Sequence, residues 1–156
     1  MPNWCINYCS LDHDDPSMVT KAANALREGK LFETFVPLPN KEWDYGWCVE
    51  NWGTKWDATC VDVFSDDGGA NLIFDTAWGP PIAFYEAMEE IGFRIDATYH
   101  ESGMAFAGHY CDGDDNTYEY DFDNPNWADE IDDQDVVDLL EEEYNLYLEM
   151  QEEEEE

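Results

Sequence analysis

The segment ATCVDVFSDDGGANLIFDT, residues 58–76, determines the fold that the sequence predicts. Its first part alternates β-branched residues with others, and this period of two predicts a strand over residues 58–64. The Asp-Gly-Gly sequence at residues 67–69 is typical of a hairpin turn, so residues 70–76 are expected to form the return strand. The centre of the chain is therefore expected to be an antiparallel hairpin.

Two further strands and two helices flank this hairpin. The alternating pattern predicts strands at residues 3–10 and 93–99. A helix is expected at residues 15–28, where an Asp-Pro pair precedes an apolar stripe and a Gly follows it. Two prolines open a second helix at residues 80–91. The order strand, helix, strand, strand, helix, strand predicts an α+β, ferredoxin-like fold, with an antiparallel sheet and both helices on one of its faces.

Two other segments are expected to add to this fold. Residues 30–56 are rich in turn residues and Trp, and they predict a long structured loop. Residues 104–111 and 117–122 predict an appended β-hairpin, across an Asp-rich turn at residues 112–116.

The C-terminal region is expected to be helical and acidic. Apolar residues recur at three- and four-residue spacing over residues 132–150, which predicts an amphipathic helix. The Glu run at residues 152–156 follows it and predicts a disordered tail. We therefore divide the chain into a ferredoxin-like body, residues 1–123, and an acidic C-terminal helix with its tail, residues 124–156.

The charge of the chain is large and unevenly distributed. The sequence has 39 Asp and Glu against 6 Lys and Arg, for a formal net charge of −33. Residues 1–111 contain 18 of the acids and all 6 bases, and residues 112–156 contain the other 21 acids. Self-repulsion of this size lowers the stability of a compact state, so the charge needs a functional reason or an unusual solvent. Adaptation to high salt and a merely solvated acidic surface remain open alternatives.

Five stretches of the sequence are more specific than its periodicity. They are MPNWC with Asn7 (residues 1–7), FVPLP (35–39), NWGTKWD (51–57), FDTAWGPP (74–81) and ESGMAFAG (101–108). Together they resemble the YubB-like ferredoxin-fold family of phages and conjugative plasmids, over about residues 1–111. The resemblance implies a ferredoxin-like fold and a mobile-element origin, and it implies no activity.

The Trp residues of these motifs have two interpretations. Trp52, Trp56 and Trp78 are expected to close the open face of the sheet together, as packing residues, or to form a ligand or partner site. Lys55 lies among them and is expected to pair with Asp57 or Asp75.

No motif of the sequence indicates catalysis, a metal or a cofactor. Residues 112–123 place acids at EF-hand-like positions, but Thr117 stands where that loop requires Gly, so a hairpin turn is expected instead. His109 and Cys111, with Cys5 and Cys9, lack a Cys-x-x-Cys pair and are not expected to bind zinc. The sequence contains no nucleophile elbow or phosphate-binding loop. We therefore expect a protein that is not an enzyme and has no metal and no cofactor.

The acidity itself suggests the function. B-form DNA carries one negative charge per about 1.7 Å of axis, so 33 charges correspond to about 56 Å of duplex. Together with the mobile-element origin that the resemblance implies, this charge predicts a DNA mimic that occupies the basic DNA-binding surface of a host defence protein, such as a restriction or CRISPR effector or another nuclease. The alternative is a protein–protein adaptor whose acidity is incidental. The acids expected to bind the partner are Asp112, Asp114, Asp115, Glu119, Asp121, Asp123, Asp129, Glu130, Asp132, Asp133, Asp135, Asp138, Glu141, Glu142 and Glu143.

The location of the protein is expected to be the host cell cytoplasm. No segment approaches the roughly 18 apolar residues of a transmembrane helix, and the N-terminus lacks a signal-peptide pattern. Five cysteines are an odd number, which fits reduced thiols. Direct binding to nucleic acid or to a membrane is not expected, because the chain has few cations to contact phosphates.

Overall fold

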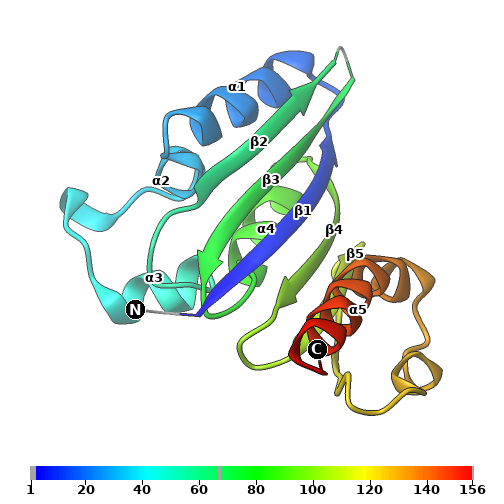
Figure 1. Cartoon of the computed structure of the whole chain (residues 1–156). Coiled ribbons are helices and arrows are strands. Elements are labelled where there is room, and N and C mark those ends of the chain that lie inside the picture. The colour runs from blue at the N-terminus through cyan, green and yellow to red at the C-terminus, as the bar shows by residue number, and fades with distance from the viewer. Residues whose placement is uncertain (1–2, 67, 156) are drawn as a thin grey trace.

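Six antiparallel strands form one curved sheet in the computed structural model, which describes residues 3–66 and 68–155 (Figure 1). The strand order across the sheet is β2-β3-β1-β4-β5-β6. The α+β class and the antiparallel sheet are thus confirmed. The strands are β1 (Trp4–Asp12), β2 (Thr59–Ser65), β3 (Gly69–Ala77), β4 (Arg94–Glu101), β5 (Phe106–Cys111) and β6 (Asp114–Glu119).

The hairpin predicted at residues 58–76 is present as β2 and β3. Strand β3 continues the sheet through β1, with Tyr8 opposite Ile73. Strand β1 also pairs with β4, so it lies between β3 and β4 in the interior of the sheet. Residue 67 of the predicted turn lies outside the described residues.

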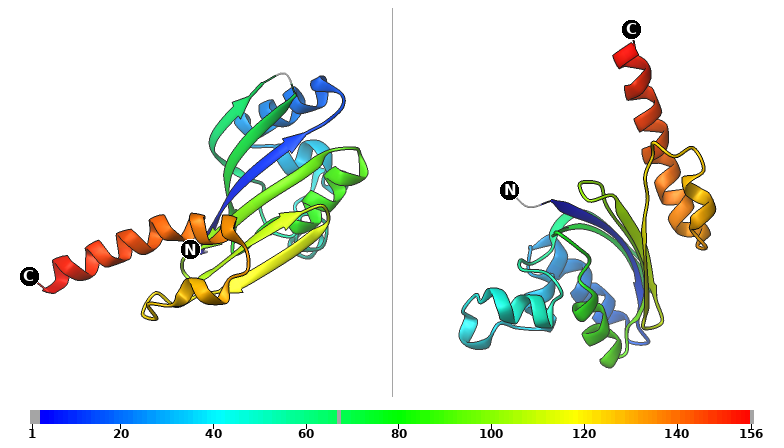
Figure 2. Two further views of the ribbon diagram at one scale, coloured as in Figure 1. Left: turned by 90° about the vertical axis from the view of Figure 1, so that its right-hand side faces the viewer. Right: turned by 90° about the horizontal axis from the view of Figure 1, so that it is seen from below.

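Four helices cover one face of the sheet: α1 (Pro16–Arg27), α2 (Leu31–Phe35), α3 (Tyr45–Asn51) and α4 (Ile82–Glu90) (Figure 2). Helix α1 begins where the sequence predicts, because the carboxylate of Asp15 accepts a hydrogen bond from the backbone N–H of Ser17 at 3.0 Å. Leu26, Phe32, Phe74 and Phe84 are buried between these helices and the sheet. The main core therefore lies on the helical face.

Residues 30–56 are not one long loop, contrary to the prediction. They contain α2, a 3-10 helix at Pro39–Lys41, and α3. Asp57 fixes the start of α2, because its carboxylate accepts hydrogen bonds from the backbone N–H groups of Phe32 and Glu33, at 2.8 and 3.0 Å. These helices are too short to show a clear helical period, and their stability comes from such tertiary contacts.

The turn between β5 and β6 is shorter than the sequence analysis predicts. Cys111 pairs with Asp114, which leaves Asp112 and Gly113 as a two-residue turn. Both turn residues have a positive φ, 51° and 85°, as the favoured Asp-Gly hairpin turn requires. The prediction of a turn over residues 112–116 is therefore wrong, and β6 begins three residues earlier than expected.

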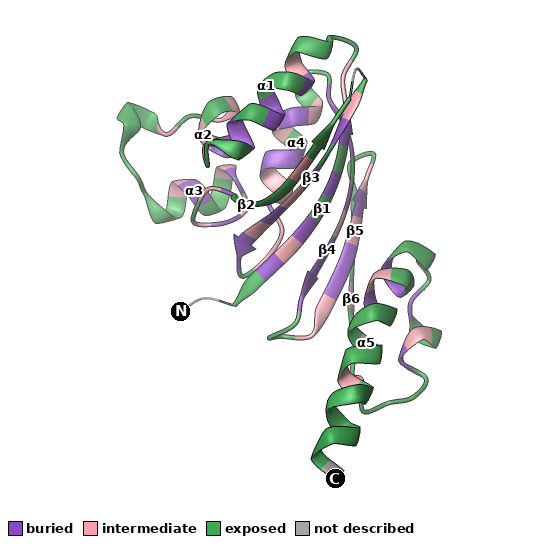
Figure 3. Cartoon of the chain, turned by 45° about the horizontal axis from the view of Figure 1, so that its top comes forward, coloured by how far each residue is buried: buried purple, intermediate pink, exposed green. Residues whose placement is uncertain are grey.

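Helix α5 (Gln134–Glu155) lies across the other face of the sheet (Figure 2). Val136, Val137 and Leu140 are buried in a second apolar cluster with Ala107 of β5 and Trp127. A short 3-10 helix, Trp127–Glu130, supplies this Trp. The second half of α5 projects away from the body and is largely exposed (Figure 3).

The C-terminal helix is longer than predicted. It continues past Met150 to Glu155, so the expected disordered tail is wrong for residues 152–155, while Glu156 lies outside the described residues. The physical reason is local, because Glu is a good helix former and no Gly or Pro follows Met150 to end the helix. The division of the chain after residue 123 stays a prediction.

Candidate acidic interaction surface

The fifteen acids predicted to bind a partner lie on one continuous part of the chain. They occupy the β5–β6 turn, β6, the segment that carries the 3-10 helix, and the first turns of α5. All of them are exposed except Asp133, which is half-buried. Among residues 3–66 and 68–155, the only Lys or Arg in a salt bridge is Arg94, which binds Asp12 and Asp14. The predicted acids are therefore free of Lys and Arg partners within the described chain.

Three of these acids also hold the surface in place. The hydroxyl of Tyr99 donates to Asp115 at 2.6 Å, and the hydroxyl of Tyr147 donates to Asp123. The hydrogen bond to Asp123 and partial burial raise the pKa of Tyr147 to about 12. Asp133 accepts a hydrogen bond from the backbone N–H of Asp135 at 3.0 Å and so caps α5. The sequence pattern does not distinguish these acids from the others.

A groove of about 650 Å³ separates α5 from the open face of the sheet. Asp135, Asp138 and Glu142 line it from the helix, and Tyr8 and Ile73 line it from β1 and β3. The three acids are spaced by three and four residues, which places them on one side of α5. We call this space the α5 groove.

The α5 groove combines negative charge with an aromatic surface. Burial first, and then the charges of Glu143 and Glu142, raise the pKa of the Tyr8 hydroxyl. An ammonium or guanidinium group that enters would meet carboxylates on one side and the ring of Tyr8 on the other, and both attract cations. No sequence pattern indicates Tyr8 and Ile73 as site residues, because only the crossing of α5 over the sheet brings them to the acids.

His109 ties the start of α5 to the sheet. Its Nε2 lies 2.6 Å from Asp96 of β4, and its Nδ1 lies 2.6 Å from Asp133. Burial lowers the pKa of His109, but the hydrogen bonds to Asp96 and Asp133 outweigh it and raise the pKa above its usual value. Because ionised carboxylates only accept hydrogen bonds, these two contacts favour the protonated, positively charged ring.

The three Trp residues of the predicted aromatic site lie in different environments. Trp52 is 2 % exposed and lies in the core on the helical face, where its indole N–H donates to the carbonyl of Val36 at 2.8 Å. It therefore does not close the open face with the other two Trp residues, contrary to the prediction. The hydrophobic effect favours burying this large ring among Phe32 and its neighbours.

Trp56 and Trp78 remain together around a lysine. They are 39 % and 48 % exposed, and the Nζ of Lys55 lies 4.2 and 4.1 Å from their ring centroids. Lys55 thus makes cation–π contacts, and the expected ion pair with Asp57 or Asp75 is absent from the described residues. The carboxylate of Asp57 is bonded to backbone N–H groups instead.

No family model, curated protein or solved structure matches the chain. The resemblance to the YubB-like family therefore rests on the five sequence motifs alone. Within residues 3–66 and 68–155, no helix is both long enough and apolar enough to cross a membrane.

Proposed function

We propose that the protein is a DNA-mimic inhibitor from a phage or other mobile element. It occupies the basic DNA-binding surface of a host defence protein, such as a restriction or CRISPR effector. One observation carries this proposal: the exposed carboxylates of β6 and α5 have no Lys or Arg partners in the described chain. An unpaired array of this kind attracts a basic cleft over a long range and speeds its association.

The spacing of charge along α5 supports mimicry of a phosphate backbone. Its 22 residues span about 33 Å at 1.5 Å per residue. Ten of them are Asp or Glu, so the helix carries one acid per about 3.3 Å of axis. One strand of B-form DNA carries one phosphate per about 3.4 Å of axis. A basic channel that binds the phosphates of one DNA strand would therefore find a similar density of negative charge along α5.

The position of these acids supports contact with a cleft. Asp135, Asp138, Glu142 and Glu149 recur at intervals of three, four and seven residues and form an acidic stripe along one side of α5. The buried Val136 and Leu140 lie on a different side of α5, so the acidic stripe stays exposed to solvent. The first part of the stripe lines the α5 groove and its end lies on the projecting half of the helix. A basic loop of the partner could therefore contact both.

We further propose that β1-α1-β2-β3-α4-β4 is a ferredoxin-like unit of the YubB-like type. The strand order β2-β3-β1-β4, with α1 and α4 on one face, supports this assignment. The hairpin β5–β6 and α5 extend that unit at β4. The five free cysteines fit a reducing compartment, and we place the inhibitor in the host cell cytoplasm with the DNA-handling proteins it would meet.

A second function is favoured by a separate observation. Strand β2 forms one edge of the sheet, and its Val61 and Phe64 are 53 % and 57 % exposed. Exposed apolar side chains on an edge strand suit a hydrophobic contact with another protein. The protein would then be an adaptor whose acidity is incidental.

The salt dependence of association separates the two functions. The immobilised protein would capture its partner from host lysate, and the purified partner would be studied by surface plasmon resonance. For a DNA mimic, we expect the association rate constant to fall at least about tenfold between about 0.05 M and about 0.2 M salt, because salt screens steering charges. An association rate that stays constant over this range would favour the adaptor and contradict mimicry.

A further inference from the structure

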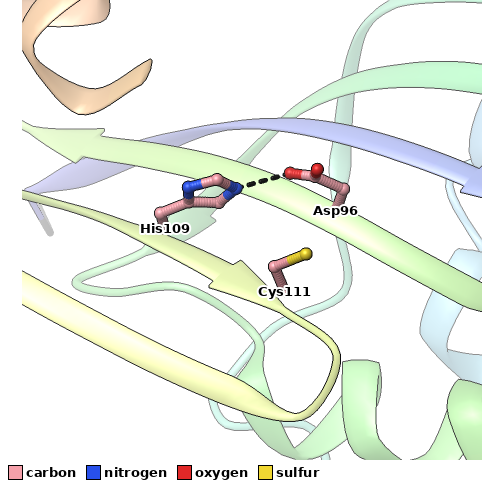
Figure 4. A group of neighbouring side chains, drawn as sticks. All are labelled: Asp96, His109 and Cys111. Carbon is pink, nitrogen blue, oxygen red and sulfur yellow. Dashed lines mark hydrogen bonds and ion pairs between the residues drawn. The ribbon is translucent and has the colours of Figure 1, made fainter. Parts of the chain in front are cut away.

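Three side chains that can bind a metal ion meet at the edge of the acidic surface (Figure 4). Asp96 lies on β4, directly opposite Cys111 of β5. His109 precedes Cys111 by two residues, so both side chains lie on the same face of β5. One ligand atom from each residue lies within 4.8 Å of the other two.

His109 is held in the orientation that a metal ligand needs. Its Nδ1 donates to Asp133 at 2.6 Å, which leaves Nε2 facing Asp96 and Cys111. In protein metal sites, a ligating His usually donates its other ring N–H to a carboxylate or carbonyl, which fixes the ring and raises its basicity. Asp133 already occupies this supporting position.

We propose that Asp96, His109 and Cys111 bind a Zn²⁺ ion, although the sequence predicts no metal site. Zn²⁺ prefers a tetrahedral set of sulfur, imidazole and carboxylate ligands, and three protein ligands leave the fourth position to water. Zn–ligand bonds of about 2.0–2.3 Å would place these atoms roughly 3.3–3.7 Å apart. The carboxylate of Asp96 therefore has to move outward by about 1 Å, and its exposed position permits that movement.

A second set of residues fits zinc less well. His109, Asp133 and Asp135 also bring ligand atoms within 4.8 Å of one another. That set has no sulfur ligand, and it would remove Asp133 from the start of α5, where it accepts the backbone N–H of Asp135. The set with Cys111 keeps this cap intact.

Binding exchanges protons for the ion. The thiol of Cys111 loses one proton and Nε2 of His109 loses another, so Zn²⁺ binding releases two protons to water. The bound ion then joins β4 to β5, and through His109 and Asp133 it also stabilises the start of α5. The site therefore connects the sheet to the helix that carries the acidic stripe.

Cobalt(II) is the direct probe of this site, because a thiolate ligand produces a charge-transfer absorption band that carboxylates do not. We expect the reduced full-length protein to develop this band, saturating at one Co²⁺ per chain, and to lose it when Zn²⁺ is added. Cys111→Ala should abolish the band. Cys60→Ala is the matched control and should keep it, because Cys60 is an exposed cysteine away from the cluster.

Asp133→Asn tests the supporting carboxylate, since Asn also caps helices well. We expect it to weaken Co²⁺ binding by about tenfold, as for other supporting residues of metal ligands, while far-ultraviolet circular dichroism stays unchanged. Co²⁺ binding without the thiolate band would show only general attraction to the acidic surface and would overturn the proposal. A band that persists in Cys111→Ala or disappears in Cys60→Ala would overturn it too.

Discussion

Deletion of residues 132–156 is expected to destabilise the protein by at least about 4 kcal/mol. The deletion removes Val136, Val137 and Leu140 from the second apolar cluster, and each buried side chain of this kind contributes about 1.5–3 kcal/mol. It also removes Asp133, the partner of His109, and exposes Trp127. Domains are stable by only about 5–15 kcal/mol, so the loss is a large fraction of the total. Urea unfolding followed by Trp fluorescence measures it.

Two matched changes serve as controls for this truncation. Deletion from Gln151 onward should change the free energy of unfolding by no more than about 0.5 kcal/mol, because residues 151–154 are exposed. Leu140→Ala should cost about 2–5 kcal/mol, because Leu140 is completely buried. The same change at Leu146, which is 54 % exposed, should cost little. If the chain without residues 132–156 unfolds at the urea concentration of the full chain, residues 1–131 fold independently and α5 adds no stability.

Neutralising the acidic stripe is expected to lower the affinity for the partner by about 1,000-fold. The variant combines Asp135→Asn, Asp138→Asn, Glu142→Gln and Glu149→Gln. Removing one carboxylate that pairs with a buried cation of the partner costs on the order of 2 kcal/mol or more of binding free energy. Two such contacts therefore account for a loss of this size. Binding isotherms at fixed salt measure it.

A scattered variant controls for net charge. The scattered variant also removes four negative charges, but from exposed positions outside the acidic stripe. It combines Glu42→Gln, Glu50→Gln, Glu86→Gln and Glu90→Gln. We expect this variant to lose no more than about threefold in affinity, because exposed charges distant from a contact are screened within about 8 Å at physiological salt. Equal losses for both variants would show generic polyanion binding and would remove the special role of α5.

The sequence was sufficient to predict an element where its local pattern matches the packing that the element makes in the folded chain. Strand β3 alternates with a period of two because one of its faces lies on the core, and Asp15 caps α1 as its Asp-Pro pair indicates. The prediction failed where the signal was too short or purely tertiary. Helices α2 and α3 have five and seven residues, and Asp57 stabilises the first of them from a distant position.

The exposure of the predicted acids could be predicted from the sequence, and their contacts could not. Charge alone identifies the acids, and fourteen of the fifteen are indeed exposed. Charge does not indicate that Asp133 contacts His109, that Asp115 contacts Tyr99, or that Tyr8 faces the acids of α5. Trp52 shares a motif with Trp56, but its burial depends on the packing of α2 and α4 around it.

Competition with DNA tests the central claim most directly. A basic host protein captured by the immobilised chain would be saturated with duplex or single-stranded DNA, and binding of the labelled chain would be measured by fluorescence anisotropy. If the acidic surface mimics DNA, saturation with DNA should abolish binding, and the apparent dissociation constant should rise in proportion to the DNA concentration. A partner that binds the labelled chain unchanged while fully loaded with DNA would contradict mimicry.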